Sequence, residues 1–457
     1  MPRNLFASLR TGVITASLIG VATAVQAMDF SAAVKSAQAF DPTTKAAQYA
    51  YQAGVETGKQ GTAMYLPQIT ATGNYNYLHI NSQANLPSGF PDSVLVGDSS
   101  GYLHGFSVTL TQPLYNASAW AGMGELHDQA RLAAIQYQSA DQNLILRVAQ
   151  SYFGVLMAED NLELTREQKA ATSQQLASAQ ARFKAGKINI TDVDDAQASY
   201  DGLVAQEISA ANNLTIQQEQ FASIVGAPPQ ALAKVPDSFI PGPPQPDKLQ
   251  DWMDRGQKGN PTVASAQVQL DISNEEISKY SLYGRPQLNL LASYQDMRQS
   301  GTLPILVAPD RSKQTIVGVQ LSVPLFAGGA YQSKLHQAEA ESQQAQYQLQ
   351  AALLNTNVQI KQQFLNVEVG VQQIAALQQA AVAAKSSLDA TILGQKVGVR
   401  TTLDVLNAQQ QYYSALQNLD TARYQYLLST LNLASLVGTL GDDDVQRVNR
   451  YLVGSAN

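Results

Sequence analysis

The stretch QITATGNYNY, at residues 68–77, alternates polar and apolar side chains almost without fault. A period of two places the polar set on one face of a β-strand and the apolar set on the other. The polar set here consists of Gln, Thr and Asn and carries no charge. A strand of about ten residues with one apolar and one uncharged polar face is typical of a transmembrane barrel, which meets lipid outside and water inside.

Three further stretches repeat this alternation, at residues 102–111, 287–294 and 314–323. Four strands cannot close a barrel, because about eight are needed. Open sheet edges are not tolerated in lipid, since unpaired backbone groups there cost several kcal/mol each. If these strands span a membrane, several chains must therefore share one barrel as a cyclic oligomer.

Aromatic residues gather at the strand ends that adjoin the helical blocks, as they do in the interfacial girdle of a membrane barrel. They are Tyr65, Tyr115, Trp120, Tyr283, Phe326 and Tyr331. The alternative is two ordinary hairpins on a soluble body, which leaves both the girdle and the uncharged polar face unexplained.

Proline placement predicts where the long helices lie. Residues 114–227 and 325–457 contain no proline, whereas seven of the 18 prolines fall within 228–246. Because proline breaks helix interiors, the two proline-free blocks predict very long helices and the proline-rich segment predicts a connector. A helix over residues 119–184 would be roughly 100 Å long at 1.5 Å per residue.

The second part of each block shows an apolar repeat of seven residues, which is typical of coiled-coil packing. One block has the columns Val405, Tyr412, Leu419, Tyr426, Leu433 and Ala408, Ala415, Ala422, Ser429, Leu436. The other has Val193, Tyr200, Glu207, Leu214, Phe221 and Ala196, Leu203, Ala210, Gln217, Ile224. Taken alone, this repeat fits an antiparallel hairpin in a soluble bundle equally well.

The two blocks are copies of each other at a constant spacing. The matched pairs include Gly186 with Gly398, Asp192 with Asp404, Tyr200 with Tyr412 and Gly226 with Gly438. Such an internal duplication indicates that each half is one complete structural unit. Each block is expected to fold back once, at its first glycine of these pairs, and function is expected where the two units face each other.

Composition excludes several classes of function. The first 27 residues predict a cleavable export signal, and beyond them no run of about 18 apolar residues predicts a membrane-spanning helix. The absence of cysteine excludes disulfides and thiolate chemistry. A net charge of -7 with only 14% charged residues argues against nucleic acid. Four isolated histidines and no catalytic motif predict neither an enzyme nor a cofactor or metal.

The sequence resembles the TolC-like outer-membrane efflux family over about residues 28–440, most clearly in RFKAG at 182–186, ITDV at 190–193 and VGVRTTLDVLNA at 397–408. The resemblance implies a mixed α and β fold with an internal duplication. In it, a homotrimer forms a twelve-stranded transmembrane β-barrel, four strands per chain, continued by a long coiled-coil α-helical barrel in the periplasm. It implies a position in the outer-membrane lipid of a Gram-negative bacterium, with a periplasmic adaptor (membrane fusion) protein and an inner-membrane pump as partners.

These observations divide the chain into successive regions. They are a signal peptide at 1–27, an N-terminal helix and equatorial region at 28–66, a first barrel hairpin at 67–113, a first long helical hairpin at 114–226, a proline-rich equatorial connector at 227–260, a helix at 261–285, a second barrel hairpin at 286–324, a second long helical hairpin at 325–438 and an equatorial tail at 439–457.

The resemblance also implies a gate where the helical hairpins turn. Polar links would hold the tube shut there, at Gln175, Thr191, Asp192, Gln395 and Arg400. An Asp192–Arg400 link is physically sensible, because a guanidinium–carboxylate bond is strong yet breakable. Gln395 departs from the tyrosine that the family usually carries, which weakens that part of the latch.

The narrowest ring of the family falls on Asp404 and Asn407, and Gly186, Lys187 and Gly398 fall on the tips that would contact the adaptor. Threefold symmetry would turn Asp404 into a cation-selective ring of carboxylates, whereas Asn407 replaces a second expected acid. A simpler account is that Asp192, Asp194 and Asp404 stabilise first turns behind the caps Thr191 and Thr401.

Two classes of function remain. One is a passive gated exit duct of a tripartite efflux pump or a type I secretion system, which exports small molecules or proteins. The other is an exported coiled-coil scaffold without a pore, in which the strands form a soluble cap. The sequence does not choose between drug efflux and protein secretion, because selectivity would lie mainly in the pump and adaptor.

Overall fold

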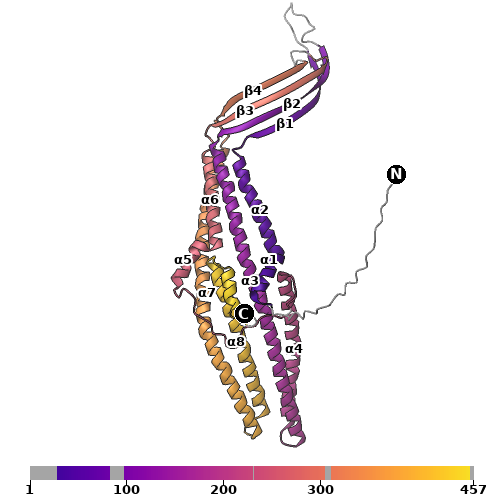
Figure 1. The fold of residues 1–457 in the computed structure, drawn as a ribbon, viewed down its shortest axis with the longest axis vertical. Helices are drawn as coiled ribbons and strands as arrows, with labels where there is room; N and C mark the ends of the chain where they lie inside the picture. The colour runs from indigo at the N-terminus through magenta and orange to yellow at the C-terminus, as the bar shows by residue number, and fades with distance from the viewer. Residues whose placement is uncertain (1–27, 83–96, 230, 304–309, 453–457) are drawn as a thin grey trace, which may run out of the picture.

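The computed structural model describes residues 28–82, 97–229, 231–303 and 310–452, so the predicted signal peptide lies outside it. These residues form a long rod of helices with a β-sheet at one end and two hairpin tips at the other (Figure 1). The elements are α1 (Phe30–Phe40), α2 (Pro42–Ala63), β1 (Gln68–Ser82), β2 (Gly97–Tyr115), α3 (Ala117–Lys184), α4 (Ile190–Val225), α5 (Leu249–Gly259), α6 (Pro261–Ser281), β3 (Gln287–Gly301), β4 (Arg311–Ser322), α7 (Ala330–Lys396), α8 (Thr402–Leu436) and α9 (Asp442–Asn449). The mixed α and β fold predicted from the sequence is confirmed.

The sheet is antiparallel throughout, with its strands in chain order β1-β2-β3-β4. Sequence-distant strands β2 and β3 pair at its centre, where Tyr102 lies opposite Ser300 and Leu110 opposite Ala292. A register shift between Pro113 and Tyr115 accommodates the proline, which has no N–H to donate. Strands β1 and β4 each have one neighbour among the described strands, so both outer edges of the sheet are open within this part of the chain.

The two faces of the sheet differ in chemistry, because residues opposite each other in neighbouring strands lie on the same face. One face is apolar near the helices, with Ile69, Ala71, Val108, Leu110, Leu288, Leu290, Val317, Val319 and Leu321. The other face is mostly polar and, over the described strand residues, uncharged; it includes Thr70, Thr72, Asn74, Ser107, Thr109, Asn289, Ser293, Gln314 and Gln320. The alternation predicted from the sequence therefore extends over all four strands.

Aromatic rings mark the junction between sheet and helices. Tyr65 stacks on Trp120 with ring centroids 5.7 Å apart, and Tyr115 meets the same indole edge-on at 5.3 Å. On the other side of the sheet Tyr283 stacks on Tyr331 at 3.5 Å. Five of the six residues predicted as a girdle are therefore in two ring clusters at this junction.

Two antiparallel helical hairpins, α3 with α4 and α7 with α8, make up the lower half of the rod (Figure 1). The predicted seven-residue columns face inward: Ala196, Leu203, Ala210 and Phe221 of α4 are buried, as are Val405, Leu419, Tyr426 and Leu433 of α8. In the upper half, α2 and α6 pack along α3, and α6 also packs along α7. No helix within the described ranges is long and apolar enough to cross a membrane.

Both hairpins turn by the same device. Gly186 and Gly398 have φ values of 67° and 87°, which only glycine adopts freely. Lys187 N donates to Arg182 O at 2.9 Å and Val399 N donates to Gly394 O at 2.9 Å, the bond of a Schellman cap. The duplication seen in the sequence is therefore a repeated tip geometry.

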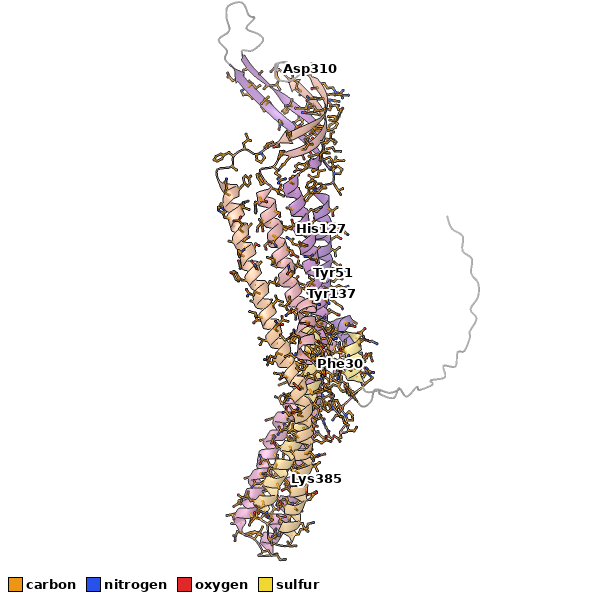
Figure 2. All side chains as sticks on the ribbon, turned by 90° about the vertical axis from the view of Figure 1, so that its left-hand side faces the viewer. Phe30, Tyr51, His127, Tyr137, Asp310 and Lys385 are labelled. Carbon is orange, nitrogen blue, oxygen red and sulfur yellow. The ribbon has the colours of Figure 1, made fainter. Side chains whose placement is uncertain are left out.

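The largest core lies at mid-height, where Figure 2 labels Phe30. Tyr152 of α3 is 0% exposed, and its hydroxyl lies 3.0 Å from the carbonyl oxygens of both Met28 and Ala233. Asn449 of α9 donates to Asp29 at 3.0 Å. The start of the described chain, the proline-rich connector and the tail thus meet on α3, which places all three at the equator of the rod.

Candidate functional site

The tip of the second hairpin is shaped by a capping box at the start of α8. Asp404 N donates to Thr401 Oγ1 at 3.1 Å, and Thr401 N donates to the Asp404 carboxylate at 2.8 Å. The hydrogen bonds from the Thr401 backbone and hydroxyl, with the Arg400 guanidinium nearby, hold the pKa of Asp404 below its usual value. The carboxylate is therefore ionised at neutral pH, and the predicted Thr401 cap is confirmed.

The first hairpin starts α4 differently. Its N-cap is Asn189, whose side chain makes no capping bond, and Thr191 already lies inside the helix. The predicted Thr191 cap is therefore wrong. The duplication itself points to the reason, because Asn189 occupies the position that Thr401 has in the second copy. Asp192 lies in the first turn of α4, as expected.

The predicted latch residues are not joined to one another within the chain. Gln395 is buried and donates to Thr402 Oγ1 at 3.4 Å, inside its own hairpin. Arg400 is exposed and packs its stem over Gly394. Among the described residues no ion pair links Asp192 to Arg400, so their link remains a prediction that would act between hairpins or chains.

Gln175 lies on α3 above the tip and is half-buried, and its Oε1 has no hydrogen-bond partner within the described part of the chain. Gln409 of α8 is buried, and its Oε1 likewise lacks a partner there. Both are amides on helices that face each other across the two hairpins. This zone contains buried acceptors that are open to a donor from another surface.

An apolar contact joins the two hairpins, and the sequence analysis did not identify it. Leu406 of α8, 7% exposed, packs against Ala179 of α3 and Ala196 of α4. We call these three residues the inter-hairpin wedge. The signal was present in the duplication, since Leu406 stands where the first copy has the exposed Asp194. A leucine in place of a solvated acid indicates that the second copy buries this face.

The remaining predicted residues lie at the open end of the rod. Gly186, Lys187 and Gly398 are exposed at the turns, and Asn407 is exposed on α8 just above Asp404. They are available to a partner surface. Among the described residues no group of three or more His, Asp or Glu side chains could hold a metal ion.

A polar contact also joins the hairpins, near the equator of the rod. Asp160 of α3 accepts from the Tyr424 hydroxyl of α8 at 2.6 Å and from Lys234 of the connector at 2.8 Å. Arg423 of α8 pairs with Asp420 at 3.0 Å and with Asp237 of the connector at 3.2 Å. We call these six residues the equatorial cluster. It binds α3, α8 and the connector together by charge.

Asp420 is the member of this cluster whose ionised form is disfavoured. Its burial, and then the negative charge of Asp160, raise its pKa from 3.8 to about 6, although Arg423 opposes the shift. An ionised Asp420 therefore costs free energy at neutral pH.

The sheet, the long paired helices and the exposed tips define a class of protein: a membrane-anchored helical rod whose sheet must be completed by other copies. The family model for the outer membrane efflux protein matches residues 28–227 and 252–439. The outer membrane protein TolC of Vibrio cholerae is 34% identical over 439 residues, which are 96% of this chain and 97% of that protein. TolC of Escherichia coli is 31% identical over 96% of this chain and 88% of its own length.

The chain therefore belongs to the outer membrane efflux protein family. A further relative, the alkaline protease secretion protein AprF of Pseudomonas aeruginosa, is 29% identical over 89% of this chain and 84% of its own. Among solved structures, the outer membrane protein VceC of Vibrio cholerae superposes with a TM-score of 0.74 at 16% identity, covering 90% of this chain and 96% of that one. The Campylobacter jejuni channel CmeC gives 0.75 at 16% identity, over 92% and 89%. At these identities the structures establish the fold alone.

We expect Leu406→Ala to loosen the contact between the hairpins, because truncating a buried leucine costs about 2–5 kcal/mol and leaves a cavity. The matched control is Leu388→Ala, which is also 7% exposed but packs within the second hairpin. Single-channel conductance in a planar bilayer should rise for Leu406→Ala and stay near wild type for Leu388→Ala. Equal conductances in the two variants would show that the inter-hairpin wedge does not contribute to gating.

We expect Asp420→Asn to raise the thermal midpoint at neutral pH. A carboxyl whose folded pKa is raised stabilises the fold below its unfolded pKa, and this stability is lost as the pH rises through the folded pKa. The window runs from 3.8 to about 6, and Asn mimics the protonated form throughout it. The gain at neutral pH should be of order 1–3 kcal/mol per chain, and it should vanish at acidic pH.

Thermal unfolding of the detergent-solubilised protein at acidic and neutral pH measures this difference. The control Asp237→Asn removes the exposed partner of Arg423 and should not raise the midpoint. A stabilisation by Asp420→Asn that is equal at both pH values would show that the raised pKa of Asp420 is not its cause.

Proposed function

We propose that three copies of this chain form a gated exit duct in the outer membrane, through which small molecules or proteins leave the cell. The observation that carries the proposal is the sheet. It has one apolar face, one uncharged polar face and two unpaired edges at the end of a long helical rod. In lipid those edges must pair, and β4 of one copy is antiparallel to β1 of the next, which continues the ladder.

The number of copies follows from the interior that a duct needs. Two copies would give eight strands, whose interior is just filled by side chains. Three copies give twelve strands and leave a wet lumen, in agreement with the resemblance to the TolC-like family. The uncharged wall would let charged and neutral solutes pass without being held.

The helices supply an independent reason for assembly. Apolar side chains on one face of α7 are exposed at alternating spacings of seven and four residues, at Tyr347, Leu354, Val358, Leu365 and Val369. Val358 is 66% exposed, although it lies in the middle of a long helix. No described part of the chain covers this stripe, so a neighbouring copy would do so and extend the helical hairpins into a tube.

The tips would form the gate at the lower end of this tube. Three copies would bring three ionised Asp404 carboxylates together, a ring that attracts cations. Arg400 and Asp192 would link neighbouring tips, while the inter-hairpin wedge holds each copy together. A periplasmic adaptor would engage the exposed turns at Gly186, Lys187 and Gly398 and join the duct to an inner-membrane pump.

The same duct suits efflux and secretion. The relatives include TolC and proteins named for protease secretion, and no feature of the tips separates the two uses. The chain is proposed to do no covalent chemistry on what it exports. A scaffold without a pore is the weaker account, since it gives no reason for an apolar sheet face with open edges.

We expect Arg400→Ser to open the gate, because it removes the cation proposed to link adjacent tips. The control Lys396→Ser removes an exposed cation from the same turn, outside the proposed latch. Single-channel recording of the purified protein should show a small wild-type conductance that rises only in Arg400→Ser. An unchanged conductance would mean that Arg400 does not hold the tips together.

We expect Asp404→Asn to weaken the block of the pore by divalent cations, since it removes three charges from one ring. Asparagine can still accept the bond from the helix N-terminus, so most of the cap should remain. The control Asp194→Asn removes an exposed charge near the start of α4. Titration with magnesium should show a higher half-blocking concentration for Asp404→Asn alone, and equal block in both variants would place the constriction elsewhere.

A further inference from the structure

Lysine and arginine side chains in the described part of the sheet are confined to one place, whereas the carboxylate of Asp98 lies near the start of β2, where it pairs with His79 at 3.1 Å. In the described strand residues the lysines and arginines are Arg298, Arg311 and Lys313, and all lie on the face that is apolar nearer the helices. Asp296 lies among them, opposite Lys313. The lumen face carries no charge along the same strands. These four residues, the strand-end basic patch, therefore do not line the proposed duct.

The patch lies at the far border of the apolar band. Arg298 is ten residues beyond Leu288 on β3, which is roughly 33 Å along a strand at ~3.3 Å per residue. A strand tilt of about 40° reduces this to roughly 25 Å across the membrane, the height of the apolar band of a membrane barrel. Figure 2 shows Asp310, which precedes Arg311, at the end of the sheet remote from the helices. The patch is therefore level with the outer head groups.

Aromatic rings flank the patch on the same face, since Phe106 is opposite Asp296 and Tyr102 is opposite Ser300, two residues beyond Arg298. Tyr102 contacts Tyr75 and Tyr77, with ring centroids 5.4 and 5.3 Å away, and Phe106 contacts Tyr294 at 6.0 Å. They form a second girdle, opposite the one at the helix junction. Aromatic belts mark both interfaces of a membrane barrel, so this cluster independently places the patch at head-group level.

The charges within the patch are not balanced. Arg311 binds the Asp296 carboxylate at 2.9 Å, and Arg298 lies 3.9 Å from it. Arg298 and Arg311 are directly opposite each other, an arrangement that is unfavourable for like charges. One buried carboxylate is shared among three cations, and the side chains of Arg298 and Arg311 are 53% and 48% exposed. The guanidinium N–H groups that Asp296 does not engage are available to an anion from outside the chain.

A polar atom next to the patch is also free to take part. His104 of β2 lies opposite Arg298, and its Nδ1 is buried without a hydrogen-bond partner within the described residues. Its ring packs on Tyr75, with centroids 5.7 Å apart. In the neutral tautomer that carries its hydrogen on Nδ1, the imidazole has a donor beside the arginine pair.

We propose that the strand-end basic patch binds the phosphate groups of lipids in the outer leaflet. Phosphate suits it because paired guanidiniums bind such oxygens with two parallel bonds, and Lys313 adds a compact charge beside them. A lipid is the source because the patch faces away from the lumen, directly above apolar side chains that acyl chains would cover. Asp296 holds Arg311 in place, so it is a positioning residue. The inference rests on the proposed function only in placing the sheet in a membrane.

The test uses the double variant Arg298→Gln/Lys313→Gln, which leaves the Arg311–Asp296 pair intact. The matched control, Lys45→Gln/Lys361→Gln, removes two exposed cations from α2 and α7. Each full-length protein is reconstituted in nanodiscs of phosphatidylcholine that contain either lipid A or enzymatically dephosphorylated lipid A. Native mass spectrometry after release then counts the glycolipids that stay bound.

Wild type and control should retain lipid A, and the patch variant should lose it about tenfold, since each basic residue near a membrane surface contributes to binding. Equal retention by the patch variant would overturn the proposal, and so would equal retention of the dephosphorylated lipid. Displacement of lipid A by inorganic phosphate at low concentration would also overturn it, because the site would then take a free ion.

Conductance of the same samples separates this proposal from the proposed function. The patch lies outside the lumen, so the variant should conduct like wild type while losing lipid A. Absence of current from all the proteins would instead refute the duct, and the lipid count would still decide whether the patch binds phosphate.

Discussion

Every backbone N–H and C=O group inside a membrane must have a hydrogen-bond partner, and a four-stranded sheet leaves two rows of them unpaired. The assembly of the molecule therefore depends on the open edges of β1 and β4, which must find partners outside the described chain. The sheet cannot enter lipid until other copies complete it, so insertion and assembly are a single requirement. The exposed stripe on α7 places the same requirement on the helices. Both the sheet and the helical rod thus have exposed surfaces that another copy of the chain would cover.

The internal duplication gives both hairpins the same turn geometry. The positions at which the two copies differ make the hairpins unequal, as the proposed gate requires. Both tips turn at a glycine with positive φ. Yet Thr401 caps its helix where Asn189 makes no capping bond, and Leu406 is buried where Asp194 is exposed. The second hairpin thus has a firmer tip and an apolar contact with the first.

Much of the fold could be predicted, because its elements are long and strongly periodic. The strands near residues 68 and 287, the break at Gly186 and the buried column from Val405 to Leu433 are all present in the structure. The site was harder to predict. The wrong cap at Thr191 came from residue type alone, whereas the position in the repeat pointed to Asn189. Leu406 lies outside the seven-residue columns of α8, so periodicity does not identify it, and only its comparison with Asp194 in the first copy does.

The sequence by itself determined the membrane-facing alternation, the seven-residue repeat and the duplication, because each is a local pattern that sets which face of an element is buried. Tertiary structure alone decided which residues meet. It placed Leu406 between α3 and α4, Asp420 beside Asp160, and Arg298 opposite Arg311. These pairs join segments whose separation in the chain carries no information about distance in space. Only packing and strand register determine such contacts. They therefore also determine which charged side chains lie close together.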